Sequence, residues 1–88
     1  MELVNIINPL LVLRPVNYRE EKFLISFGKR LKELRRIKKM TQEDLAYTSG
    51  ITLSQIARIE TGKINPTICT INMIAKTLKV SPKDLLDF

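Results

Sequence analysis

The chain has 88 residues and a mass of 10.1 kDa, with 44% hydrophobic and 27% charged residues, which is typical of one small globular domain. It contains no histidine, no tryptophan and one cysteine, which excludes histidine acid–base catalysis, a disulfide framework and a cysteine/histidine zinc site. The longest apolar run, residues 10–13, is far shorter than the roughly 20 residues of a membrane-spanning helix, and no secretory leader is recognisable. We therefore expect a cytoplasmic, non-enzymatic domain without metal, cofactor or membrane.

Positive charge is concentrated in the middle of the chain. Fifteen lysines and arginines outnumber nine acidic residues, so the net charge is +6 and the pI is near 9.8. All the basic residues of the block 23–50 fall between Lys29 and Lys39, whereas residues 1–22 carry no net charge. A concentrated cationic segment is typical of a protein that binds a polyanion. From charge alone, a solvated lysine-rich helix face is an equally good interpretation.

Residues 1–22 are expected to form an arm that precedes a domain of residues 23–88. Pro9 and Pro15 interrupt this apolar segment and disfavour a long helix. Residues 10–13 are predicted to be extended, because the residue before Pro15 prefers β or polyproline geometry. Packing on the domain, pairing with a second copy and partial mobility are three alternatives for this arm.

A first helix is predicted over residues 21–38. Apolar residues recur at three- and four-residue steps and lie on one stripe, with the cationic residues around the other side: Leu24, Phe27, Leu31 and Leu34. Met40 adds an apolar contact beyond the end of this helix. Thr41 then starts a second helix, because its hydroxyl can accept the backbone N–H of Asp44, and Gly50 ends that helix.

Three further helices follow. Thr52 and Gln55 fit a capping box at the start of the third helix, which Thr61 and Gly62 stop. A fourth helix opens at Asn65-Pro66-Thr67, with one apolar stripe: Ile68, Ile71, Ile74, Ala75 and Leu78. A fifth starts at Ser81-Pro82, where proline suits the first helical position. The sequence therefore predicts an all-α domain of five short helices.

The second and third helices have the spacing of a helix-turn-helix. Ala46 is small where the two helices must cross closely, and Gly50 allows a sharp turn. Ile51, Ile56 and Ile59 fill the wedge between the helices. The opposite face of the third helix is then free to enter a groove.

Two strings within residues 27–88 resemble the Cro/lambda-repressor-type (XRE-like) helix-turn-helix domains: FGKRLKELRRIKKMTQEDLAYTSGITLSQIARIETGKINPT and IAKTLKVSPKDLLDF. The resemblance implies a compact five-helix lambda-repressor-like fold that binds double-stranded DNA. The arm lies outside the family pattern. Lys39 also departs from it, since such domains usually have glycine or asparagine there, and a lysine adopts left-handed geometry only at a cost.

The resemblance implies DNA contacts along the second and third helices. Gln42 would hold a backbone phosphate at a helix N-terminus. Leu53 and Ser54 would look into the major groove from the first turn of the recognition helix, where leucine can touch a thymine methyl group and serine a base edge. Thr52 shares this turn, but a capping hydroxyl is partly committed to the backbone.

Four further residues complete the predicted DNA interface. Gln55 either completes the capping box or reaches a base or phosphate. Arg58 is the only charged residue predicted on the groove face, where it suits guanine or a phosphate. Lys63 and Asn65 match loop positions that approach the DNA backbone and fix register. One or two phosphate contacts are expected among the exposed cations of the first helix: Lys29, Arg30, Lys32 and Arg36.

Arg35 and Glu60 have a different expected role. Their counterparts in the family pair across the first and third helices, so the resemblance implies an internal ion pair. The loss of either partner from a truly buried pair would cost about 3–5 kcal/mol.

A single recognition helix reads too short a sequence to be specific, so we expect a homodimeric repressor that binds a palindromic operator. Four apolar residues form either the dimer surface, extended by the arm, or the domain's own core: Val80, Leu85, Leu86 and Phe88. The alternative function is an antitoxin-like or protein-interaction module that uses the same fold and meets a protein partner through its arm.

Overall fold

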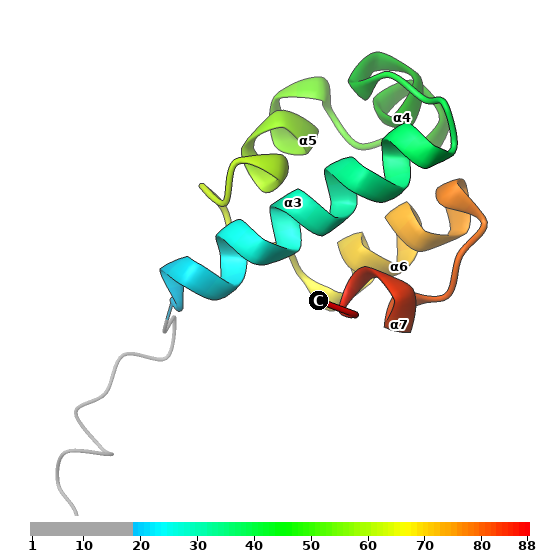
Figure 1. The fold of residues 1–88 in the computed structure, drawn as a ribbon. Helices are drawn as coiled ribbons and strands as arrows, with labels where there is room; N and C mark the ends of the chain where they lie inside the picture. Colours follow the sequence, from blue (N-terminus) through cyan, green and yellow to red (C-terminus); the bar gives the residue numbers. More distant parts are fainter. Residues whose placement is uncertain (1–18) are drawn as a thin grey trace, which may run out of the picture.

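A computed structural model of the protein describes residues 19–88 (Figure 1). Within this range there are five helices and no strand: α3 (Glu21–Ile37), α4 (Gln42–Ser49), α5 (Leu53–Glu60), α6 (Ile68–Leu78) and α7 (Pro82–Leu85). Figure 1 shows α3 crossing the domain, with α4 and α5 on one side of it and α6 and α7 on the other. The predicted all-α fold is confirmed. The predictions for residues 1–18 lie outside the described residues.

Helices α4 and α5 begin at the two predicted caps. Thr41 Oγ1 accepts the backbone N–H of Asp44 at 3.0 Å, and Asp44 Oδ2 accepts that of Thr41 at 2.9 Å. Hydrogen bonding of the Asp44 carboxyl to Thr41, first to its backbone N–H and then to its side chain, lowers the pKa of that carboxyl. Gly50 then ends α4 with a φ of 79°, and only Ile51 and the cap Thr52 precede α5. The turn of the helix-turn-helix is therefore built by local sequence.

The hydrophobic core lies between α3 and the other four helices. Its largest fully buried side chains come from every helix: Leu31, Leu45, Ile56, Ile59, Ile74, Leu78 and Leu85. Leu85 therefore belongs to the core and not to a dimer surface, and Val80 packs partly buried against the same cluster. Leu86 and Phe88 are 48% and 53% exposed, so only these two of the four candidate residues remain available to a partner.

Helix α3 approaches α5 most closely at Gly28. A Cβ atom at this position would lie 2.5 Å from the carbonyl oxygens of Ile59 and Glu60, so no larger residue fits without movement of the backbone. Glycine costs helix stability in the middle of α3. Close packing of α5 on α3 offsets that cost.

Two lysines end helices in left-handed geometry. Lys39, which follows the C-cap Lys38 of α3, has a φ of 58°, and Lys79 at the end of α6 has the same value. The strained end expected at Lys39 is thus present in the fold. The second one, at Lys79, was not predicted from the sequence.

Candidate nucleic-acid interface

Helix α5 has one buried face and one exposed face. Ile56, Ile59 and Glu60 are buried against the rest of the domain. Leu53, Ser54 and Arg58 are exposed. Ser54 and Arg58 share the face opposite the core because they lie four residues apart, and Leu53 is exposed at the first position of the helix. The exposed part of α5 therefore carries an apolar, a hydroxyl and a cationic side chain.

The first turn of α5 uses two of the candidate residues for its own cap. Thr52 Oγ1 accepts the backbone N–H of Gln55 at 3.1 Å and donates to Gln55 Oε1 at 3.2 Å. Gln55 Oε1 also accepts the backbone N–H of Thr52 at 3.3 Å. The Thr52 hydroxyl has donated its only hydrogen and can accept one further hydrogen bond, whereas the Gln55 Nε2 group remains able to donate to a ligand.

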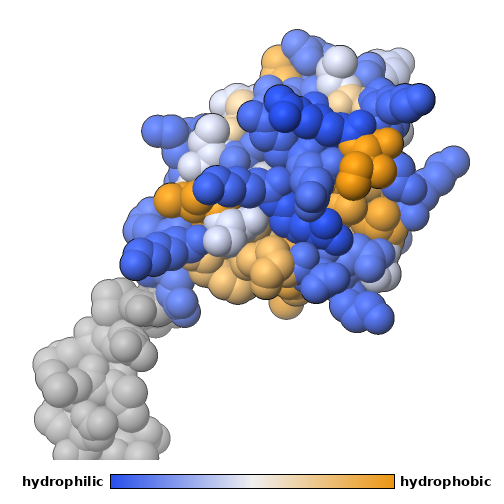
Figure 2. Space-filling view, viewed as in Figure 1, coloured by the Kyte–Doolittle hydropathy of each residue, from blue (hydrophilic) through white to orange (hydrophobic). Residues whose placement is uncertain are grey.

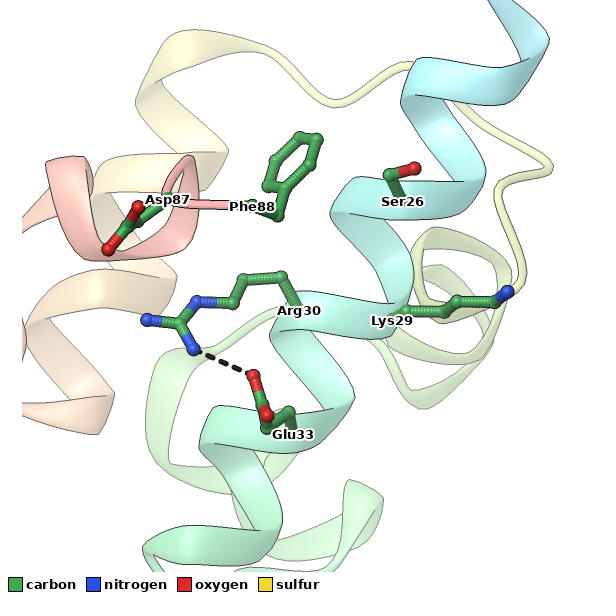
Figure 3. A pocket seen from close by; sticks show the side chains of 6 residues that line it. All are labelled: Ser26, Lys29, Arg30, Glu33, Asp87 and Phe88. Carbon is green, nitrogen blue, oxygen red and sulfur yellow. Dashed lines mark hydrogen bonds and ion pairs between the residues drawn. The ribbon is translucent and has the colours of Figure 1, made fainter.

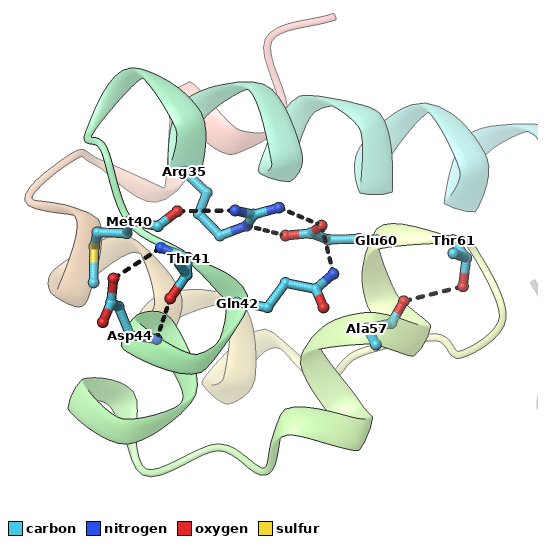
Figure 4. A network of polar contacts seen from close by, with 8 residues as sticks. All are labelled: Arg35, Met40, Thr41, Gln42, Asp44, Ala57, Glu60 and Thr61. Atoms are coloured by element: carbon cyan, nitrogen blue, oxygen red, sulfur yellow. Dashed lines mark hydrogen bonds and ion pairs between the residues drawn. The ribbon is translucent and has the colours of Figure 1, made fainter.

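Gln42 lies at the start of α4 and points toward α5 (Figure 4). Its Nε2 donates to Glu60 Oε1 at 3.0 Å, and the side chain is only partly buried. The amide nitrogen has a second hydrogen, and the side-chain oxygen has no partner among residues 19–88. Gln42 is therefore oriented by Glu60 and keeps one hydrogen-bond donor and its side-chain oxygen without a partner among residues 19–88.

The Glu60 carboxylate that accepts the hydrogen bond from Gln42 is itself held in place by Arg35 (Figure 4). Arg35 Nε donates to Glu60 Oε2 at 2.6 Å and Arg35 Nη2 to Oε1 at 3.0 Å, which is a bidentate ion pair. Arg35 Nη1 also donates to the carbonyl oxygen of Met40 at 2.8 Å. Hydrogen bonding to Glu60 raises the pKa of Arg35, although burial opposes this shift. One network thus connects α3, the turn after it, α4 and α5.

The loop after α5 contributes the last two candidates. Thr61 and Gly62 end the helix, with a φ of 74° at Gly62. The backbone N–H of Lys63 donates to the carbonyl oxygen of Arg58 at 2.8 Å, so only its exposed side chain is free to reach DNA. Asn65 is exposed in the same loop.

The cations of α3 do not all have the same surroundings. Arg30 crosses to α7, where its Nε donates to the carbonyl oxygen of Asp84 at 2.9 Å, and its Nη1 pairs with Glu33 at 2.7 Å. Figure 3 shows this arginine in a shallow hollow that Lys29 and Phe88 also line. Lys29, Lys32 and Arg36 are exposed, and no ion pair within residues 19–88 includes them. Arg30 therefore serves the fold, and these three remain candidates for phosphate contacts.

Sequence reasoning missed the link from Gln42 to Glu60 and the role of Gly28. Both depend on contacts between distant parts of the chain. An isolated glycine within a helical pattern was the available sign of a close backbone approach at Gly28. No local sign existed for the orientation of Gln42.

A family model described as a helix-turn-helix domain matches residues 28–87. The chain belongs to this family, and its fold is of the Cro/lambda-repressor type. Two curated relatives are the control protein C.BamHI of Bacillus amyloliquefaciens, 41% identical over 63 residues, and the transcriptional repressor RghR of Bacillus subtilis, 40% identical over 62 residues. These matches cover 70% and 69% of this chain, respectively.

The relatives differ in how much of their own length is matched. The chain spans 44% of the regulator RghRB of Bacillus subtilis and 46% of RghR, but 78% of C.BamHI. A crystal structure of the restriction-modification controller protein C.AhdI from Aeromonas hydrophila has a TM-score of 0.69 at 39% identity, and the match covers 70% of this chain and 94% of that one. A DNA-binding regulator of transcription is the class of protein that these findings support.

No helix within residues 19–88 has both the length and the apolar character needed to cross a membrane.

Proposed function

We propose that this protein is a homodimeric, sequence-specific repressor of transcription that reads a palindromic operator through the major groove. The exposed face of α5 carries this proposal, because Leu53, Ser54 and Arg58 project from a helix whose other face is fixed in the core. A repressor of this kind acts by occupying DNA that polymerase needs. It works as a cytoplasmic protein without catalysis or a cofactor.

Each candidate DNA contact has a distinct part in the proposal. Arg58 donates to guanine in two-point fashion or to a phosphate, while Ser54 and Leu53 read a base edge and a thymine methyl group. Gln42, Lys63, Asn65 and the free amide of Gln55 hold the DNA backbone, which sets register without reading sequence. Thr52 caps this turn, and its hydroxyl can still accept one hydrogen bond from a base edge.

A dimer is required by the small size of this reading surface. Helix α5 has eight residues, four of them exposed, and the proposal assigns three of these side chains to the bases. Two such helices placed one turn of DNA apart, roughly 34–36 Å, read both halves of a palindrome. The related controller C.AhdI and the control protein C.BamHI favour a narrower candidate, a restriction-modification controller, because this chain matches most of their length.

Selection from a randomised DNA pool tests the proposal directly. The purified protein should enrich a two-fold palindrome. As the salt concentration rises, binding to random duplex should be lost while binding to the enriched site is still measurable. Recovery of no motif, with salt-sensitive binding to every duplex, would favour the protein-interaction alternative.

The substitution Arg58→Ala then tests the groove assignment. We expect specific affinity to fall by about 5- to 150-fold, the range for loss of a good base contact of about 1–3 kcal/mol, with unchanged folding. Lys83→Ala is the matched control, since Lys83 is an exposed cation on α7, across α3 from α5 (Figure 1). Equal loss in both variants, or full specific affinity in Arg58→Ala, would contradict the assignment.

A further inference from the structure

The loop of residues 61–66 follows α5 and carries two of the proposed DNA-backbone contacts, Lys63 and Asn65. The backbone N–H of Gly62 donates to the carbonyl oxygen of Ile59 at 3.1 Å, and the N–H of Lys63 also returns to α5, at 2.8 Å. These two hydrogen bonds fix the start of the loop to the end of α5. The carbonyl oxygen of Gly62 takes part in neither of them and points to a different partner.

The first two turns of α3 lie directly against this loop. Gly62 is buried, and a Cβ atom there would lie 2.8 Å from Cγ1 of Ile25 and 2.9 Å from its Cα and backbone nitrogen. Three side chains of the same turns help to line a small pocket together with the end of the loop: Phe23, Leu24, Phe27, Asn65 and Pro66. The loop therefore follows the start of α3 over most of its length.

Arg19, two residues before α3, provides the polar part of this contact. Its Nη2 donates to the carbonyl oxygen of Gly62 at 3.3 Å. The same guanidinium is oriented by Glu21, with Nε donating to Oε1 at 3.0 Å and Nη2 to Oε2 at 3.4 Å. A planar guanidinium can hold a carboxylate and a carbonyl oxygen at the same time, whereas an ammonium group on a flexible stem is a single point charge. Figure 2 shows hydrophilic side chains over the surface where α3 begins.

We propose that Arg19 is a positioning residue for DNA binding, which holds the loop after α5 so that Lys63 and Asn65 reach the DNA backbone. This inference rests on the proposed function. A side chain contacts a phosphate well only if the backbone that carries it is already in place, and such support comes from residues behind the contact. Arg19 acts through the Gly62 carbonyl oxygen and not through its own charge.

Amide hydrogen exchange in the full chain without DNA tests the support itself. Arg19→Ala should accelerate exchange of the Gly62 and Lys63 amides by at least about threefold, because the loop then opens more often. The amide of Ile56 should keep its rate, since an exposed ion pair contributes little to global stability. Unchanged exchange at Gly62 and Lys63 would overturn the proposal.

Lys22→Ala is the matched control for the loss of charge. Lys22 is an exposed cation one residue after Glu21, and no ion pair within residues 19–88 includes it. This variant removes the same charge as Arg19→Ala from the same part of the molecule. Exchange at Gly62 and Lys63 should remain at the wild-type rate. Equal acceleration in both variants would overturn the proposal.

DNA affinity tests the consequence of this support. On the operator recovered by selection, Arg19→Ala should bind about five- to tenfold more weakly, and random duplex should lose affinity by a similar factor, because backbone contacts carry no sequence information. Lys22→Ala should stay within about twofold of wild type, as expected for one solvated charge. Wild-type affinity in Arg19→Ala, with a loosened loop, would overturn the proposal.

A double-mutant cycle separates positioning from a direct contact by Arg19. In a chain that already carries Lys63→Ala and Asn65→Ala, Arg19→Ala should weaken binding by no more than about twofold, because residues that act through one group are not additive. A further five- to tenfold loss in that chain would show that Arg19 binds DNA on its own. If wild type binds no duplex, the proposed function fails and this proposal fails with it, whereas unchanged loop exchange beside intact DNA binding overturns this proposal alone.

Discussion

The two faces of α5 differ in nearly every contact that they make. On the inner face, Ile56 and Ile59 are at most 1% exposed, and Glu60 is held by Arg35 and Gln42. On the outer face, the side chains of Ser54 and Arg58 make no hydrogen bond or ion pair with any residue in 19–88. The same eight-residue helix is thus fixed by one side and left free on the other.

This difference separates stability from recognition along a single helix. A substitution on the inner face removes contacts that the folded state needs, and it should lower the free energy of unfolding. A substitution on the outer face removes nothing that the fold uses, and it should change DNA binding alone. Variants on and around α5 can therefore test whether the two properties are independent.

Glu60→Ala should have the largest effect, because it leaves the buried guanidinium of Arg35 without its carboxylate. We expect a loss of about 3–5 kcal/mol in the free energy of unfolding, measured by urea denaturation. Glu43→Ala, which removes an exposed acid from α4, is the control and should cost little. If the Glu60 variant were as stable as the Glu43 variant, the inner face of α5 would contribute no more to stability than an exposed surface, and the contrast between the two faces would be refuted.

Gly28→Ala should follow, although alanine is the better helix former. The added Cβ would meet the backbone of Ile59 and Glu60 at 2.5 Å and would push α5 away from α3. We expect a loss of about 1–3 kcal/mol, the usual cost of overpacking. Lys32→Ala, on the exposed side of α3, should be neutral or slightly stabilising. Thermal unfolding of both variants would check the contrast, and a more stable Gly28 variant would refute the close approach.

Lys39→Gly should raise stability by a smaller amount. Glycine adopts the observed φ of 58° without the penalty of a side chain, but it also adds freedom to the unfolded chain. The balance is a gain of about 0.5–1 kcal/mol. Lys38→Gly, at a φ of −81°, should give no gain. If DNA affinity also fell in Lys39→Gly alone, the turn beyond α3 would belong to the recognition surface as well.

Asp44→Asn should have the smallest effect, and one that depends on pH. The pKa of Asp44 is lowered in the folded state, so its carboxylate stabilises the protein above the unfolded pKa of about 4 and loses this effect as pH falls through the folded value. Wild type should melt at a higher temperature than the variant at pH 7, and the gap should close toward pH 3. A gap of constant size across this range would exclude the charged cap as its origin.

Local chemistry made most of the fold predictable. Thr41, Thr52 and Thr67 cap their helices through the backbone N–H three residues later, and a short-range pattern of this kind is visible in any sequence. Helix α3 was expected over residues 21–38 and ends at Ile37. Its long apolar stripe made that prediction robust.

The candidate site was less predictable because its geometry depends on contacts across the chain. The pairing of Arg35 with Glu60 was expected only through a family resemblance. The hydrogen bond from Gln42 to Glu60 joins residues 18 apart, and no periodicity encodes it. Leu85 ends the four-residue helix α7, which is too short for a stripe, and Leu86 follows it as the C-cap, yet Leu85 is buried and Leu86 is 48% exposed.

The exposed cations of α3 act over a longer range than the hydrogen bonds and apolar contacts of α5. Lys29, Lys32 and Arg36 lie on a different helix from the reading residues, and their field extends about 8–10 Å into physiological salt. Charges in such positions accelerate diffusional encounter more than they prolong a complex. In the proposed operator complex, α5 would set the lifetime of the complex, while α3 would set how quickly the protein finds DNA.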